Sequence, residues 1–153
     1  MLENFFLYIN FINQNLENNY LIFFLIYFFS LIFFFSFSLP GGPILLISTG
    51  FFFGFYIGFL INIFSILIGS YFFVFFVKSF LNSFFNKLYF KFSNKLNKLI
   101  KNSSYEYLII FRLIQGNPLF FQNLCLSFLN ISKTKFILTS FFGFCPVIII
   151  FTY

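Results

Sequence analysis

A long stretch without any charged side chain, residues 18–77, constrains this chain more than any other feature. The sequence Pro40-Gly-Gly-Pro43 interrupts it near its centre. At membrane depth, a backbone N–H or C=O group that faces lipid without a partner costs several kcal/mol. Such a break is tolerated only where other protein or a water-filled cavity surrounds it. We therefore interpret the break as the tip of a re-entrant or broken helix that lines a site.

A half-helix is predicted to start directly after the break. Pro43 suits its first position, because the φ angle of proline is fixed and it has no N–H to leave unpaired. Such a helix directs its positive dipole end and its free N–H groups into the protein. The small residues that follow predict faces for close helix packing, and they are Gly50, Gly54, Gly58 and Gly69. The alternative is a spanning helix that is kinked by proline and presents the same packing face.

The composition decides the class of protein. Charged residues make up 8 % of the 153 residues, and the mean hydropathy is +0.99. Because this leaves too little polar surface to cover a soluble fold, we expect an all-α polytopic membrane protein. The sequence has no histidine, and Cys125 and Cys145 are not spaced as metal ligands, so we expect no metal and no cofactor. Both cysteines are interpreted as small buried hydrophobic residues.

The lengths of the apolar runs predict about three crossings. Residues 20–39 and 136–153 each have about the length of one crossing. Residues 44–77, as one straight helix, would extend about 51 Å at 1.5 Å per residue, well beyond a hydrocarbon core of about 30 Å. We therefore expect a half-helix over 43–55, followed by a crossing over 56–77.

Two polar segments flank these crossings. Residues 1–19 have the pattern of an amphipathic interfacial segment, which precedes a membrane domain over 20–153. Within residues 78–104, lysines recur on one helix face opposite leucine and phenylalanine, which predicts a basic amphipathic helix on an anionic leaflet. An ordinary lysine-rich loop is the alternative, and either version lies in the cytoplasm. Two crossings then place the N-terminus in the cytoplasm too, and we expect the inner membrane of a bacterium.

A second break, Gly116-Asn117-Pro118, interrupts the apolar residues 105–130. Asn117 is a good N-cap and Pro118 a good first helical residue, and Asn123 follows on a polar helix face. Arg112, the only arginine, precedes this break, and at membrane depth it must be paired or face water. If it lies at the interface instead, it can snorkel. Lysines follow directly after 105–130, so this segment is expected to enter and leave from the cytoplasmic side.

These motifs together resemble the DedA-like, VTT-domain family, which is also called the SNARE-associated Golgi protein family. The resemblance covers residues 38–153 and rests on Leu39-Pro-Gly-Gly-Pro43, Thr49-Gly-Phe-Phe-Phe-Gly54, Gly69-Ser70, Arg112-Leu-Ile-Gln-Gly-Asn-Pro118, Asn123 and Phe142-Gly-Phe-Cys-Pro146. It implies two re-entrant hairpins that face each other from opposite leaflets. It also implies lipid transport across bilayers, by scrambling of phospholipids or flipping of polyprenyl-phosphate carriers, in some members coupled to protons. The residues at family motif positions are Pro40, Gly41, Gly42, Gly50, Gly54, Arg112, Pro118, Asn123, Gly143 and Pro146.

The chain departs from the family's pattern at several positions. Many bacterial members carry an acidic residue in the first hairpin region, and this chain has none there, which removes the usual group for proton coupling. Gln115 stands where a proline is usual, and Ser127 where a glycine is usual. A further C-terminal helix is normal in the family, so we expect the sequence to be truncated at that end.

Two interrupted segments in corresponding halves predict a midplane site in an inverted-repeat transporter. We expect a lipid or lipid-phosphate transporter of the flippase or scramblase kind, in which two half-helix N-termini and one arginine attract a phosphate head group. The predicted substrate-binding residues are Gly41, Gly42, Pro43, Arg112, Gly116, Asn117, Pro118 and Asn123. Partners are membrane lipids, anionic or phosphate-bearing ones included, and no nucleic acid, while a homo-oligomer stays open.

The same features bear on two other functional classes, a membrane scaffold and an enzyme. A non-transporting membrane scaffold or envelope-integrity protein, whose glycine faces pack partner helices, is the alternative to transport. An enzyme is not expected, because the sequence has no histidine and no intramembrane pair of acids, and Glu106 lies at the end of a span.

Overall fold

The computed structural model describes residues 19–84, 105–114, 118–129 and 131–153. The regular elements in these ranges are all helices, which confirms the predicted all-α class: α2 (Tyr20–Ser36), α3 (Gly42–Phe84), α5 (Tyr105–Leu113), α6 (Leu119–Ser127) and α7 (Lys133–Thr152). The predicted interfacial segment, most of the basic segment, and the binding candidates Gly116 and Asn117 lie outside the described residues.

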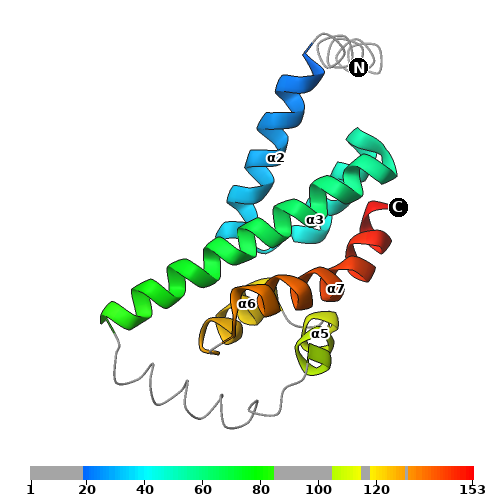
Figure 1. The fold of residues 1–153 in the computed structure, drawn as a ribbon. Helices are drawn as coiled ribbons and strands as arrows, with labels where there is room; N and C mark the ends of the chain where they lie inside the picture. Colours follow the sequence, from blue (N-terminus) through cyan, green and yellow to red (C-terminus); the bar gives the residue numbers. More distant parts are fainter. Residues whose placement is uncertain (1–18, 85–104, 115–117, 130) are drawn as a thin grey trace. The chain divides into compact units, whose positions relative to one another are not determined.

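The chain divides into two compact units, Met1–Ser30 and Leu31–Tyr153. In the first unit, the described part is the start of α2, where the hydroxyl of Ser30 donates to the carbonyl of Ile26 at 2.7 Å. This bond satisfies a polar group within an apolar helix. The second unit contains both predicted breaks, and in it α7 packs against α3 and α5 while α6 packs against α3 (Figure 1).

The first break begins with a Schellman motif that ends α2. The N–H of Leu39 donates to the carbonyl of Phe34 at 3.4 Å, and the N–H of Ser38 donates to the carbonyl of Phe35 at 3.1 Å. Ser38 has a φ of +49°, in the left-handed conformation that this motif requires and that glycine usually supplies. A left-handed residue with a side chain costs roughly 1–2 kcal/mol more than glycine. The Ser38 hydroxyl therefore needs a role beyond ending the helix.

Gly54 divides α3 into two helical segments, residues 42–53 and 55–84. Its φ of +73° and ψ of 169° are not helical. The expected half-helix followed by a long helix is thus present, and the boundary falls at the glycine. Among the described residues, Gly42–Phe80 and Lys133–Thr152 are long and apolar enough to cross a membrane, while Tyr20–Ser36 is apolar but shorter.

Glycines allow three close backbone approaches in the second unit. A Cβ atom on Gly50 would collide with the backbone carbonyl of Thr152. One on Gly58 would lie 3.1 Å from the Thr152 side chain, and one on Gly69 would lie 2.6 Å from Cβ of Phe35. The predicted packing role therefore fits the surroundings of Gly50, Gly58 and Gly69.

Gly54 requires a correction, because a Cβ atom there would meet nothing within 4 Å. Its importance comes from its backbone angles, which lie in a region that is essentially restricted to glycine. The predicted packing face of Gly50, Gly54 and Gly58, which are four residues apart, is thus interrupted at the point where the helix itself is interrupted.

We predict that Gly54→Ala and Gly54→Leu destabilise the protein to the same extent, by about 1–3 kcal/mol, because both must adopt the glycine-only backbone angles. Thermal unfolding of the purified protein in detergent measures this. Gly50→Ala is the steric control, since its Cβ atom meets backbone. If Gly54→Ala unfolds like the parent while Gly54→Leu does not, a packing contact and not the backbone decides this position.

Asn62 joins both segments of α3 to the end of α7. Its amide donates to the carbonyl of Leu46 at 3.2 Å and to the hydroxyl of Thr152 at 2.9 Å, and the side chain is fully buried. A buried polar group that is hydrogen-bonded on several elements fixes their register. This contact keeps residues 42–53 folded back beside residues 55–84.

The two ends of α7 contact different parts of the chain. At its start, the ammonium of Lys135 lies 4.9 Å from the ring centre of Tyr105, the first residue of α5. Nearby, the ammonium of Lys78 donates to the carbonyl of Leu129 at 3.1 Å, just after α6. At the other end, the ring of Tyr153 packs against the ring of Phe55, with 5.9 Å between the two ring centres. We call these the lysine end and the Tyr153 end of the second unit.

Candidate functional site

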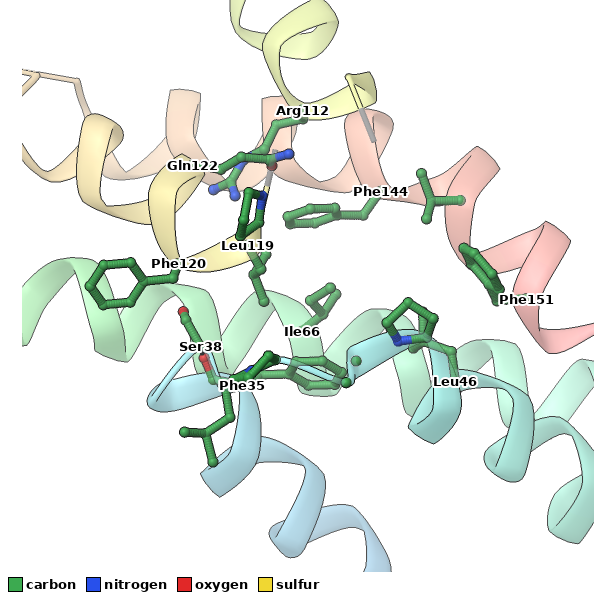
Figure 2. A pocket seen from close by; sticks show the side chains of 17 residues that line it. Phe35, Ser38, Leu46, Ile66, Arg112, Leu119, Phe120, Gln122, Phe144 and Phe151 are labelled. Carbon is green, nitrogen blue, oxygen red and sulfur yellow. Dashed lines mark hydrogen bonds between the residues drawn. The ribbon is translucent and has the colours of Figure 1, made fainter. Parts of the chain in front are cut away.

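A cavity of about 380 Å³ lies between the first break and Pro118, which is the described residue of the second break (Figure 2). Its walls are mainly apolar, with a few polar groups, which is the usual composition of a binding pocket. The residues that line it are Phe35, Ser38, Leu39, Pro40, Gly41, Gly42, Pro43, Leu46, Ile66, Arg112, Pro118, Leu119, Phe120, Gln122, Phe144, Val147 and Phe151. In Figure 2, Arg112 and Gln122 lie on one side of the cavity, and Phe35, Ser38 and Leu46 on the other.

The cavity brings together five of the eight predicted binding residues, and these are Gly41, Gly42, Pro43, Arg112 and Pro118. A sixth, Asn123, is bonded to Arg112. Two helices begin here, α3 at Gly42 and α6 at Leu119. Pro118 is the N-cap of α6 and not its first helical residue, one position from the expectation. The positive dipole ends of both helices therefore face the cavity wall.

Arg112 is almost fully buried, with 1 % of its surface exposed. One terminal nitrogen donates to Oδ1 of Asn123 at 2.8 Å, and the other donates to the hydroxyl of Ser140 at 3.0 Å. The guanidinium also lies 4.6 Å from the ring centre of Phe144, a favourable cation–π distance. The alternative prediction, that Arg112 lies at the interface and snorkels, is therefore wrong, because a snorkelling arginine exposes its head group.

The charge of Arg112 has no carboxylate partner among the described residues. Both hydrogen-bond acceptors are neutral, and Nε of Arg112 has no partner there. Glu106, the acid of the described ranges, lies six positions earlier on α5, about 9 Å along the helix axis at 1.5 Å per residue. A positive charge in a helix at the bilayer centre costs about 2.5–3.5 kcal/mol on insertion scales. The structure thus maintains a positive charge beside the cavity, where two helix dipoles add to it.

Asn123 connects this charge to the first break. Its amide nitrogen donates to the hydroxyl of Ser38 at 3.0 Å and to that of Ser70 at 3.3 Å. The network therefore joins the end of α2, the long segment of α3, α6, α5 and α7. This contact also gives the Ser38 hydroxyl its role, since a glycine would end α2 at lower cost but would leave the Asn123 amide only its longer hydrogen bond to Ser70 among the described residues.

Two further features shape the surroundings of Arg112. A Cβ atom on Gly143 of α7 would collide with the Arg112 side chain, so the missing side chain makes room for the arginine stem. Gln122 of α6 donates to the carbonyl of Ile114 at 3.3 Å, which draws the start of α6 against the end of α5. Gly143 was a family motif position, whereas Gln122 was not among the predicted binding residues.

Residues that the sequence did not single out complete the site. Ser38, Ser70, Ser140 and Gln122 are all buried and all belong to the contacts described above. Cys125 and Cys145 are free thiols of intermediate burial, so they are less buried than predicted. Within the described ranges, His, Cys, Asp and Glu side chains form no group that could hold a metal ion.

These features define an all-α membrane protein in which the first break and the start of α6 meet at a cavity that one buried arginine lines. The model of the VTT domain matches residues 39–153, and the chain belongs to that family, the DedA type of membrane protein. Neither a curated protein nor a solved structure matches the chain.

Proposed function

We propose that this protein moves lipids with an anionic or phosphate-bearing head group across the bilayer, without a chemical step. The observation that carries the proposal is the buried charge of Arg112, which has no carboxylate partner in the described residues and lines a cavity at two helix N-termini. Charge-assisted hydrogen bonds to a phosphate are about twice as strong as neutral ones, and a guanidinium offers them in a planar fork. The head group occupies this cavity while the acyl chains stay in the bilayer.

The ends of the helices support two re-entrant hairpins. The start of α5 contacts Lys135, and the chain just after α6 contacts Lys78. The helix α5 therefore begins at the lysine end, and α6 ends there. Each of them has nine residues, about 14 Å at 1.5 Å per residue, which is about half of a 30 Å hydrocarbon core. We propose that this hairpin enters to mid-membrane and returns.

The first break approaches from the other leaflet in this proposal. Residues 42–53 extend from the cavity towards the Tyr153 end, where Gly50 lies against Thr152. Since α7 is long enough to cross a membrane, we propose that its two ends face opposite leaflets. A cavity between two tips that enter from opposite sides is the arrangement expected for an inverted-repeat transporter.

The experiment that tests the role of the charge is Asn123→Asp. An aspartate keeps a partner for Arg112 and can accept hydrogen bonds from the hydroxyls of Ser38 and Ser70, but its charge neutralises the guanidinium. We expect the variant to insert and fold, and to move anionic head-group-labelled lipid in liposomes about tenfold or more slowly, as loss of one charge-assisted contact implies.

Two comparisons make this result interpretable. Thermal unfolding of the same preparation separates loss of transport from loss of folding. Asn123→Ser, which leaves the guanidinium charge uncompensated, is the matched variant and should keep more transport than Asn123→Asp. Equal transport in the parent and in Asn123→Asp would mean that the charge of Arg112 does not contact the lipid.

Topology gives a second prediction. The lysine end is expected in the cytoplasm, because positively charged segments concentrate there. In a cysteine-free background, Lys95→Cys and Lys133→Cys should react with an impermeant maleimide in inverted vesicles and not in intact cells. Labelling of only one of them from outside would mean that residues 105–130 cross the membrane fully. The cytoplasmic position of the N-terminus stays a prediction.

The scaffold alternative is less well supported. It was motivated by glycine faces that were expected to pack against partner helices. In the described residues, Gly50, Gly69 and Gly143 instead receive other segments of their own chain. These faces are therefore used within the protein.

A further inference from the structure

A second, smaller cavity lies at the lysine end, separate from the cavity at Arg112. Its volume is about 100 Å³, and its walls come from α3, the end of α6, the chain after α6 and the start of α7. Lys78 and Lys133 both line it, together with Tyr71, Val74, Leu126 and Phe136. Two cationic side chains far apart in sequence thus share one cavity with apolar walls.

Lys78 is fixed in this cavity. Its ammonium donates one hydrogen bond to the carbonyl of Leu129 at 3.1 Å, and an ammonium has three donors. Because the side chain is held by this bond, further donors are oriented before a ligand binds. Lys133 is exposed and has no carboxylate partner among the residues described. Two like charges that face one cavity repel each other, and an anion between them removes that repulsion.

We propose that Lys78 and Lys133 bind the phosphate of an anionic phospholipid from the adjacent leaflet. The volume of about 100 Å³ leaves room for a phosphate group between the two ammonium groups. Val74, Leu126 and Phe136 line the same cavity, so its lining suits a ligand that carries an apolar chain beside its anion. Basic pockets between membrane helices on the cytoplasmic side bind lipid head groups in this way.

The site is independent of lipid transport, because it shares no lining residue with the cavity at Arg112. Phosphatidylglycerol, with one net negative charge, is the expected ligand class. Phosphatidylcholine is the comparison lipid, since its own ammonium balances its phosphate. A lipid held here fixes the end of α3 to the start of α7.

The test is native mass spectrometry of the purified full-length protein titrated with each lipid. In the Arg112→Gln background, which removes the charge of the central cavity, the protein should bind phosphatidylglycerol about tenfold more tightly than phosphatidylcholine, and adding Lys78→Gln and Lys133→Gln should remove that preference. Glutamine keeps a donor for the carbonyl of Leu129 and removes the charge. The matched control is Lys135→Gln, whose ammonium lies over Tyr105 and does not line this cavity, so the preference should remain.

Because every variant is made in the Arg112→Gln background, a loss of the preference is assigned to this site and not to the transport cavity. Equal binding of the two lipids by the Arg112→Gln protein would overturn the proposal, as would equal loss when Lys135→Gln or the two lysine substitutions are added. Displacement of phosphatidylglycerol by millimolar inorganic phosphate would assign the site to a free anion and overturn its assignment to lipid.

Discussion

Replacing Arg112 by glutamine should reduce the movement of head-group-labelled anionic lipid in liposomes to the rate of protein-free liposomes. The substitution removes the one charged side chain that lines the central cavity in the described part of the chain. Two helix N-termini remain, but a helix end contributes only about half of an elementary charge. A phosphate that leaves water would then lack the partner that offsets its desolvation.

Arg112→Lys should also slow transport, by about ten- to hundredfold, since a hydrogen bond to a charged group contributes about 1.5–3 kcal/mol. The guanidinium contacts Asn123 and Ser140 through separate nitrogens and still has Nε beside them. One ammonium nitrogen on a flexible stem cannot reproduce this planar fork. The lysine variant keeps the charge, so it should insert and should transport more than the glutamine variant.

These variants are compared at matched protein amounts, with thermal unfolding measured on the same samples. Equal transport in the parent and Arg112→Lys would exclude a role that depends on the fork of donors. Equal transport in all three proteins would remove Arg112 from the site altogether.

Filling the central cavity should be nearly as damaging. Val147 lines it from α7, and Val147→Trp replaces a small side chain with one that occupies much of a cavity of about 380 Å³. The contacts between Arg112, Asn123 and Ser140 do not involve Val147, so folding should be retained. We expect transport of every labelled lipid to fall by about tenfold or more, because a filled cavity excludes the head group regardless of its charge.

Ile150→Trp is the matched control on the same helix. Ile150 is 66 % exposed and does not line the cavity, so a tryptophan there should leave transport at the level of the parent. If both tryptophan variants transport like the parent, lipid moves along some other path on the protein. If both lose transport equally, a change in α7 and not the filled cavity explains the loss.

The breaks and the charge could be predicted from the sequence because each depends on a local physical rule. Proline and glycine in an uncharged run cannot face lipid, and an arginine at membrane depth cannot stay without partners. These two rules alone indicated Gly41, Gly42, Pro43, Arg112 and Pro118, which the fold brings to one cavity. The division of α3 followed from length, since one straight helix would be too long for a bilayer.

The hydroxyls of the site could not be predicted in the same way. The hydrogen-bond partners of these serines lie far away in sequence. Ser38 and Ser70 accept from Asn123, and Ser140 accepts from Arg112. Serine in a membrane helix is usually satisfied by the carbonyl one turn earlier, as Ser36 is by Ile32 at 2.7 Å, so its presence carries little information. A serine at the end of α2, where the following chain forms a tight turn, was the one available signal.

Gly54 illustrates the limit of pattern reasoning. Its spacing from Gly50 and Gly58 predicted a packing face, but spacing describes a continuous helix, and the chain is not helical at this residue. A pattern of small residues cannot distinguish a glycine that makes room for a neighbour from one that changes the backbone direction.

The central claim is that the cavity at Arg112 passes anionic lipid head groups across the bilayer. Its most direct test is the purified parent protein in liposomes, with head-group-labelled phosphatidylglycerol in both leaflets. Exposure of the label to a membrane-impermeant quencher is then followed over time. The account predicts that the protected half of the label becomes accessible at a rate that increases with the amount of protein. Folded protein at every tested amount with label movement equal to that of protein-free liposomes would contradict it.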